Sequence, residues 1–331
     1  MSITPTPTLP ANTSRVVILD TNAYRELTHG LSLEAARERA LEARRLERTQ
    51  GGLPLASAIV IWELAAHLAD PADPAYTHCL NALVALAEHT RATDDPDAPI
   101  MLVTDSEWLV CEVLFGQAPR GAAENVRHLS DLALHIRQHA PTLQAPAVLA
   151  NLQRFAAEMQ QRESNWLADL QQALTQCEPA AAKAWLGGGT DKEAGKRLRT
   201  FLSSRAFYEL YAMVAVAHYA ALVGVTLTPD ELGRRADFFT EQFASPFRLM
   251  QTLLSKLVGH SDLNLTSPKR KRGNFMWDFA LCHLIAGDPI GDGTPVCVVT
   301  DDRAILEAAT AAACAPSALS LNDYRQRIAL I

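Results

Sequence analysis

Two parts of the chain alternate short apolar runs with helix-like segments. Near the N-terminus, the run RVVILD (15–20) precedes residues of helical composition, and the run LPLASAIVIWEL (53–64) then leads into a second helix. The pattern returns near the C-terminus with a helix at FMWDFALCHLIAG (275–287) and a strand at VCVVT (296–300). Alternation of strands and helices is typical of a parallel sheet with right-handed crossovers, so both parts predict α/β structure.

Between these parts the chain is almost entirely helix-like. The segment 151–176 is the clearest amphipathic helix, because its apolar residues recur at helical spacing: Leu152, Phe155, Met159, Trp166 and Leu170. One strand is predicted here, IMLVT (100–104), and LGGGTD (186–191) predicts a loop. Residues 210–227 have the length of a membrane span, but many alanines and a central His218 favour a buried helix of a soluble domain.

The predicted fold class is therefore α/β, with a central, mostly parallel sheet and a large all-helical insertion. We expect residues 1–14 to form a flexible tail, residues 15–65 and 267–331 to form one domain, and residues 66–266 to form the insertion. A length of 331 residues fits one domain with a large insertion as well as two domains.

Composition narrows the functional classes. With 48% hydrophobic and 20% charged residues, the chain can bury a sizeable core, and global disorder is excluded. The net charge of −7 means that any contact with nucleic acid must come from a local basic patch. Six scattered cysteines without a CxxC pair, and an N-terminus without signal-peptide features, predict a reduced, cytoplasmic protein.

Acidic residues follow the predicted strands or lie in the helices after them. Asp20 ends the first strand, Glu63 follows the second and is expected to be partly buried, Asp278 lies in an apolar helix, and Asp301 and Asp302 follow a later strand. The carboxyl ends of parallel strands form the crevice where such folds bind ligands. Two carboxylates about 4 Å apart repel by on the order of 4 kcal/mol, so a cluster needs protons, basic partners or a cation. Oxygen ligands favour Mg²⁺ or Mn²⁺, which suits phosphodiester hydrolysis.

Four segments, VVILDTNAYREL, LASAIVIWEL, NFMWDFALCHLIAG and VVTDDRAI, together resemble the motifs of the PIN-domain nucleases. The family pattern is strand-Asp-Thr-Asn, Ser-x5-Glu-Leu, a helical Asp and Thr-x-Asp, and the resemblance covers about residues 15–65 and 270–331. It implies a three-layer α/β/α fold. It also implies a metal-dependent endonuclease that cleaves RNA, with single-stranded DNA as an alternative substrate.

The resemblance also implies roles for individual residues. The acids that hold Mg²⁺ or Mn²⁺ would be Asp20, Glu63, Asp278 and Asp302. The polar residues that orient acids or water would be Asn22, Ser57 and Thr300, with Asp301 in the variable position beside Asp302. The stretch between the second and third acids is much longer than in small members of the family, so the substrate's identity does not carry over.

Two further features, Asp105 and the basic run at 269–272, each allow two interpretations. Asp105 in LVTDSEW follows an apolar run as Asp301 does in VVTDDRA. The residues after Asp105, however, have the pattern of a helix start, so we interpret Asp105 as a helix cap. The basic run Lys269, Arg270, Lys271 and Arg272 lies just before Asp278, and we expect it to bind the phosphates of RNA. A solvated loop or a nuclear-import signal is the competing interpretation of the basic run.

Other functions stay open at this level. A haloacid-dehalogenase-type phosphatase also begins with a strand-ending Asp, but it needs a second Asp where this chain has Asn22. An inactive, partner-recruiting or nucleic-acid-binding module is the alternative from a different class. A homodimer, and a protein partner or inhibitor that docks on the helical insertion, also stay open, whereas no membrane partner is expected.

Overall fold

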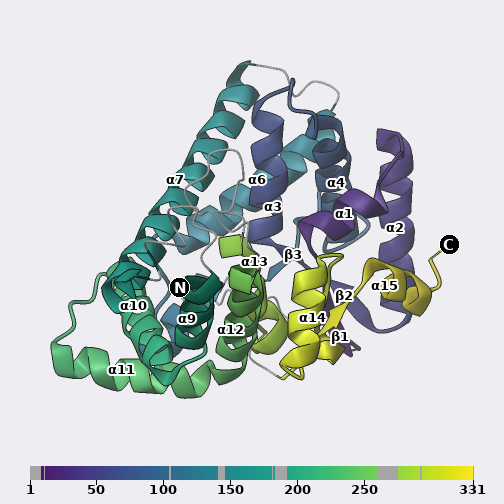
Figure 1. Ribbon diagram of the computed structural model, residues 1–331. Coiled ribbons are helices and arrows are strands. Elements are labelled where there is room, and N and C mark those ends of the chain that lie inside the picture. Colours follow the sequence, from purple (N-terminus) through teal and green to yellow (C-terminus); the bar gives the residue numbers. More distant parts are fainter. Residues whose placement is uncertain are drawn as a thin grey trace.

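The computed structural model describes residues 9–10, 12–103, 106–140, 146–180, 182, 192–259, 275–290 and 293–330 (Figure 1). Some predictions lie outside these residues: the cap at Asp105, the loop at 186–191, the basic run Lys269–Arg272 and most of the N-terminal tail. Within the described residues, the predicted mixture of many helices with a small, mostly parallel sheet is confirmed.

The first and last parts of the chain meet in a four-stranded parallel sheet. Its strands are β1 (Arg15–Leu19), β2 (Gly52–Pro54), β5 (Val296–Val299) and β6 (Ala318–Leu319), in the order β2-β1-β5-β6. Residues of β1 pair with β5 from Val16 opposite Val296 to Leu19 opposite Val299. The strands predicted at 15–20 and 296–300 are therefore neighbours, although nearly the whole chain separates them.

A second pair of strands continues from the edge of this sheet. β3 (Ala56–Ser57) pairs in parallel with β4 (Leu102–Val103). The connecting Leu55 donates its N–H to the Val17 carbonyl at 2.9 Å, and Ala56 donates to the Met101 carbonyl at 2.8 Å. The strand predicted at 100–104 is therefore confirmed at Leu102–Val103, within the largely helical insertion. β4 pairs with backbone groups that β3 would otherwise expose.

Helices cover both faces of the sheet. Alternate residues of a strand point to opposite sides, and both sides of β1 are buried. Val17 and Leu19 of β1 lie in one buried core, and Val16 and Ile18 lie in another. We name these cores after helices that contribute to them, with the bounds given below: the first is the α1–α4 core and the second is the α10–α14 core. The sheet therefore lies between two helical layers.

The α1–α4 core takes residues from α1 (Thr21–Leu27), α2 (Leu33–Thr49), α3 (Ala58–Ala66), α4 (Tyr76–His89), α6 (Ala122–His139), α7 (Pro146–Cys177) and α15 (Leu321–Ile328), and it also includes Trp277 of α13 (Phe275–Ala286). The other core takes residues from α5 (Ser106–Phe115), α9 (Lys192–Leu202), α10 (Arg205–Val223), α11 (Pro229–Gln242), α12 (Ala244–Gly259) and α14 (Arg303–Ala311), and other residues of α13. The described residues also form two short 3₁₀ helices, η1 (His67–Ala69) and η3 (Ala315–Ser317).

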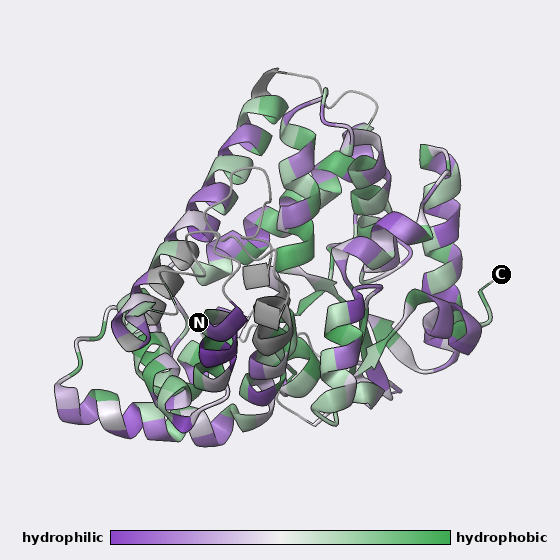
Figure 2. Cartoon of the chain, viewed as in Figure 1, coloured by the Kyte–Doolittle hydropathy of each residue, from purple (hydrophilic) through white to green (hydrophobic). Residues whose placement is uncertain are grey.

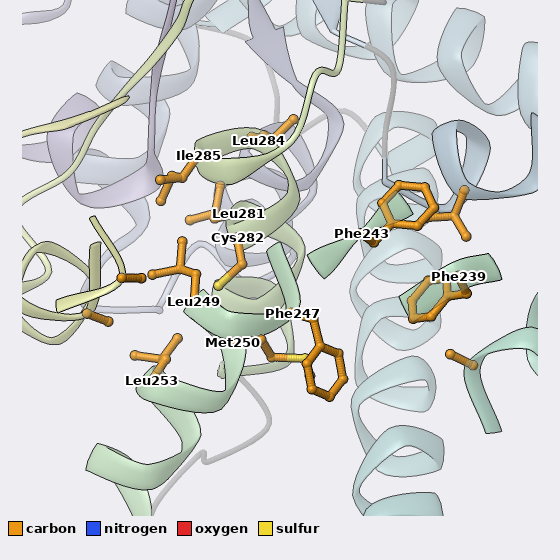
Figure 3. Packing of buried hydrophobic residues seen from close by; sticks show 14 of the residues in the cluster. Phe239, Phe243, Phe247, Leu249, Met250, Leu253, Leu281, Cys282, Leu284 and Ile285 are labelled. Carbon is orange, nitrogen blue, oxygen red and sulfur yellow. The ribbon is translucent and has the colours of Figure 1, made fainter. Parts of the chain in front are cut away.

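The α10–α14 core is aromatic and aliphatic. Figure 3 shows the side chains of α12 and α13 meeting those of Phe239 and Phe243, and Phe247, Leu249 and Leu281 are all buried there. Full burial of one such side chain contributes about 1.5–3 kcal/mol. This core attaches the helical block to the face of the sheet rather than leaving it as a separate lobe.

The apolar helix expected at 210–227 is α10, which has the length and composition of a membrane span. Its Phe207, Val216 and Tyr219 are buried in the α10–α14 core, and α11 and α5 pack against it. Figure 2 shows that α11, by contrast, is mainly hydrophilic along its length. One face of α10 is therefore packed within the protein, while Met213 and Val214 of the same helix are exposed, so the predicted burial holds for part of the helix.

The second predicted strand is shorter than its apolar run suggests. Helix α3 already begins at Ala58, so the β-branched residues Ile59, Val60 and Ile61 are helical. All three are buried, in the layer that also includes α4 and α7. Tertiary burial of this kind overrides the β preference of branched side chains.

Candidate functional site

Asp20 lies at the carboxyl end of β1, where the chain turns into α1. Its own N–H continues the strand pairing by donating to the Val299 carbonyl at 2.9 Å. Its Oδ1 accepts from the Ala23 N–H at 2.6 Å, so Asp20 is the N-cap of α1. Only 4% of the residue is exposed, which leaves a carboxylate almost wholly withdrawn from water.

Thr300 connects Asp20 to the acid at the end of β5. Its side chain is fully buried and forms a hydrogen bond with the Asp20 carboxylate. Its Oγ1 also accepts from the Asp302 N–H at 3.0 Å. Because β1 and β5 are adjacent and parallel, this one hydroxyl fixes both strand ends relative to each other.

Asp301 and Asp302 have different contacts. Asp302 is the N-cap of α14, with Oδ1 accepting from Ala304 at 2.7 Å and Ile305 at 3.2 Å. Asp301 is exposed, and its Oδ1 accepts from the Leu321 N–H at the start of α15, at 3.0 Å. Both charges act on Asp20, and that of Asp302 acts more strongly.

Glu63 lies on α3 and is partly buried, as the sequence predicts. Its Oε2 accepts a hydrogen bond from the Thr21 hydroxyl, and Thr21 is the residue after Asp20. Glu63 therefore comes to the same edge of the sheet as Asp20, by way of α1.

The pKa values of Asp20 and Glu63 are both raised, by burial and by neighbouring carboxylates. Burial raises the pKa of Asp20 to about 6, the bonds from Thr300 and Ala23 oppose that rise, and the charges of Asp302 and Asp301 add to it. Burial likewise raises the pKa of Glu63 to about 7, the bond from Thr21 opposes the rise, and the charges of Asp20 and Glu163 add to it. Arg25 is the basic side chain that acts against the Glu63 shift. Like charges thus gather here with little cationic compensation.

The remaining predicted residues are distributed around this edge. Asn22 is exposed on the first turn of α1, and Ser57 is buried where β3 meets α3, without a capping bond from its side chain. Asp278 lies in α13 between Trp277 and Phe279, and the structure describes its backbone but not its side chain.

Three side chains that sequence analysis did not select also belong to this region. Thr21 could have been found, because it is the middle residue of the Asp-Thr-Asn text. Arg25 follows one helical turn later on α1. Glu163 comes from α7 in the helical insertion, and no local pattern in the sequence distinguishes it from other charged residues of that helix.

The donor chemistry of this edge fits a hard divalent cation. Its acids are oxygen donors, as Mg²⁺ and Mn²⁺ prefer, and an excess of buried negative charge is what a cation would compensate. Among the described residues, however, no three His, Cys, Asp or Glu side chains gather closely enough to hold a metal ion. The side chain of Asp278 is not part of that set.

The fold and the site together define an α/β protein with buried and partly buried carboxylates near the carboxyl ends of parallel strands. Comparison with protein-family models, with curated proteins and with solved structures gives no match. The resemblance to PIN-domain nucleases stays a prediction that rests on the sequence motifs. What the chain does must therefore be argued from its own residues.

Proposed function

We propose that the protein is a metal-dependent, PIN-like endonuclease of the cytoplasm that hydrolyses phosphodiester bonds, with RNA as its substrate. One observation carries this proposal. Asp20, Asp302 and Glu63, which come from distant parts of the sequence, are each fixed by hydrogen bonds at the carboxyl ends of the strands. Within the described residues their charges meet no matching set of basic groups. A buried excess of negative charge is costly, and sites that bear such a cost are commonly functional.

In this proposal, Asp20, Glu63, Asp278 and Asp302 would hold Mg²⁺ or Mn²⁺. The bound ion supplies an activated water and compensates negative charge on the phosphate oxygens. Thr300 and Thr21 hold the carboxylates of Asp20 and Glu63 in place through the bonds described above. Preformed bonds of this kind mean that the acids need little rearrangement to bind a cation.

Other residues would position the substrate. Asn22 is exposed beside Asp20 and would bind water or a phosphate oxygen. The basic run Lys269–Arg272, which lies outside the described residues, would hold the phosphates that flank the scissile one. Arg25 acts electrostatically on Glu63 and would attract the same polyanion to the edge.

The decisive experiment compares the wild type with Asp20→Asn on labelled single-stranded RNA and single-stranded DNA, with Mn²⁺, with Mg²⁺ and with EDTA. We expect metal-dependent cleavage of RNA by the wild type and at least about a 100-fold loss of rate in the variant, or about 2.7 kcal/mol in the barrier. Asp131→Asn on the exposed face of α6 is the matched control and should keep the wild-type rate. A wild type that binds RNA but cleaves nothing with either metal would instead support an inactive binding module.

The assignment of Asp302 rather than Asp301 can be tested in the same assay. Asp302→Asn should lose cleavage to about the same extent as Asp20→Asn, because it removes a charge next to Thr300 and Asp20. Asp301→Asn should lose less than about tenfold, because Asp301 is exposed and contacts α15. The reverse result would show that Asp301 is the metal-site acid.

A further inference from the structure

A glutamate of the helical insertion contacts the helix that carries the third predicted acid. Glu163 of α7 accepts a hydrogen bond at Oε1 from the indole Nε1 of Trp277, at 2.9 Å. Trp277 lies in α13, is 7% exposed and immediately precedes Asp278 in the chain. The insertion is therefore joined by a directional bond to the turn of α13 that carries Asp278.

The residue before Glu163 contacts the helix that carries the second acid. The guanidinium of Arg162 lies over the indole of Trp62, 4.4 Å from the ring centroid, and Trp62 immediately precedes Glu63. The rings of Trp62 and Trp277 are edge to face, with centroids 6.1 Å apart. Consecutive residues of α7 thus hold two touching tryptophans, each adjacent in sequence to a predicted acid.

The bond to Trp277 has a clear energetic reason. A buried indole N–H without an acceptor costs about 1–3 kcal/mol. Glu163 satisfies it with a charged acceptor, and such bonds are about twice as strong as bonds between neutral groups. The same carboxylate raises the pKa of Glu63. Its charge is therefore close enough to act on the acids at the carboxyl ends of the strands, Asp20, Glu63 and Asp302, which we call the acidic edge.

Resting on the function proposed above, we infer that Glu163 is a positioning residue of the acidic site: its hydrogen bond to Trp277 holds α13 so that Asp278 can complete the set of acids. The helical insertion therefore takes part in forming the site and does not only surround it. Removing the bond should loosen that turn of α13 and weaken metal binding. Replacing the acceptor by a neutral one should largely preserve both.

Four variants separate this role from others. Glu163→Leu removes the acceptor, Glu163→Gln keeps an acceptor without the charge, and Trp277→Phe removes the donor. Glu158→Leu, on an exposed position of the same helix, is the matched control. Mn²⁺ affinity is measured by isothermal titration and by electron paramagnetic resonance on protein whose thermal transition confirms folding. The indole ¹H–¹⁵N signal of Trp277, assigned by its loss in Trp277→Phe, reports the bond directly.

We expect Glu163→Leu and Trp277→Phe to weaken Mn²⁺ binding by about 10–100-fold, as losses of outer-shell partners do. Glu163→Gln should stay within about threefold of the wild type, Glu158→Leu should match it, and the Trp277 signal should move most in Glu163→Leu. Wild-type affinity in Glu163→Leu would overturn the positioning role, and so would an equal loss in Glu163→Gln and Glu163→Leu. A wild type that binds no Mn²⁺ and cleaves no RNA would instead overturn the proposed function.

Discussion

Helix α1 connects two buried polar clusters that are built in opposite ways. Tyr24 of α1 bonds to the ring of His89 at 2.9 Å, and the other ring nitrogen of His89 lies 3.0 Å from a carboxylate oxygen of Glu47. Next to His89, Glu88 forms ion pairs with Arg91 at 2.8 Å and with Arg137 at 2.6 Å. We call these residues the paired cluster, because each of its carboxylates faces a basic group.

The acidic edge, formed by Asp20, Glu63 and Asp302, begins four residues before Tyr24, at the N-cap of the same helix. Among the residues that the structure describes, it lacks this compensation. Asp20 and Glu63 are bonded by hydroxyl and backbone donors, and the charges that act on them are mainly those of other carboxylates. A buried charge without a partner destabilises a fold, whereas a paired one is tolerated. Burial alone therefore does not distinguish the two clusters. Uncompensated charge of one sign does, and that is why we propose a function for the acidic edge.

The largest expected effect comes from breaking the paired cluster. Glu88→Gln leaves Arg91 and Arg137 buried without their counter-charge, and loss of one partner from such a site costs about 3–5 kcal/mol. The free energy of unfolding, measured by urea denaturation with an unchanged m-value, should fall by that amount. Glu307→Gln breaks an exposed ion pair with Arg303 and serves as the control, at a few tenths of a kcal/mol. Equal effects of the two variants would mean that the paired cluster is not structural.

Sequence patterns could place one of these clusters far better than the other. Asp20, Thr300 and Asp302 were predictable because each lies within three residues of the end of an apolar strand, and parallel strands bring such ends together. The paired cluster has no such local signature, since Glu47 and His89 lie on amphipathic helices where charged and polar residues are ordinary.

Two other features were beyond sequence reasoning for physical reasons. The strand at β4 was predicted, but its place beside β3 was not, because it depends on backbone bonds between segments 46 positions apart, with Ala56 opposite Leu102. The bond between Glu163 and Trp277 joins residues 114 positions apart, and helical periodicity indicates which face is apolar but not which polar residue meets a distant donor.

Replacing a carboxylate by an amide should raise the free energy of unfolding at the acidic edge, whereas it should lower that free energy at the paired cluster. Asp20→Asn removes a buried charge that other carboxylates repel, while Asn still accepts the capping bond from Ala23. The pKa rise from 3.8 to about 6 corresponds to a cost of up to about 3 kcal/mol for the charged form. In EDTA at pH 8, the variant should therefore be more stable than the wild type by about 2–3 kcal/mol.

Under the proposed function, added Mn²⁺ should then reduce or reverse that difference, because it would bind the native wild type more tightly than the variant. The measurement is the urea midpoint of both proteins with EDTA and with Mn²⁺. A loss of stability in Asp20→Asn under EDTA, of the kind expected for Glu88→Gln, would mean that the acidic edge is a structural cluster like the paired one.

A smaller effect concerns His283 of α13, a half-buried residue on which, within the described part of the chain, no charged group acts to shift its pKa. Its ring packs edge to face on Phe243 with centroids 5.6 Å apart, and its Nδ1 is buried without a hydrogen-bond partner among the described residues. Burial lowers its pKa from 6.5 to about 4, so the unfolded chain binds the proton more readily than the folded one. The contribution of the neutral ring to the free energy of unfolding is therefore complete above about pH 6.5 and is lost as the pH falls towards 4.

Between pH 7.5 and pH 5 the free energy of unfolding of the wild type should fall by about 2 kcal/mol more than that of His283→Phe, which keeps an aromatic ring but cannot be protonated. Parallel pH profiles of the two proteins in urea denaturation would instead show that His283 has the same pKa in the folded and the unfolded chain, so that burial does not hold its ring neutral.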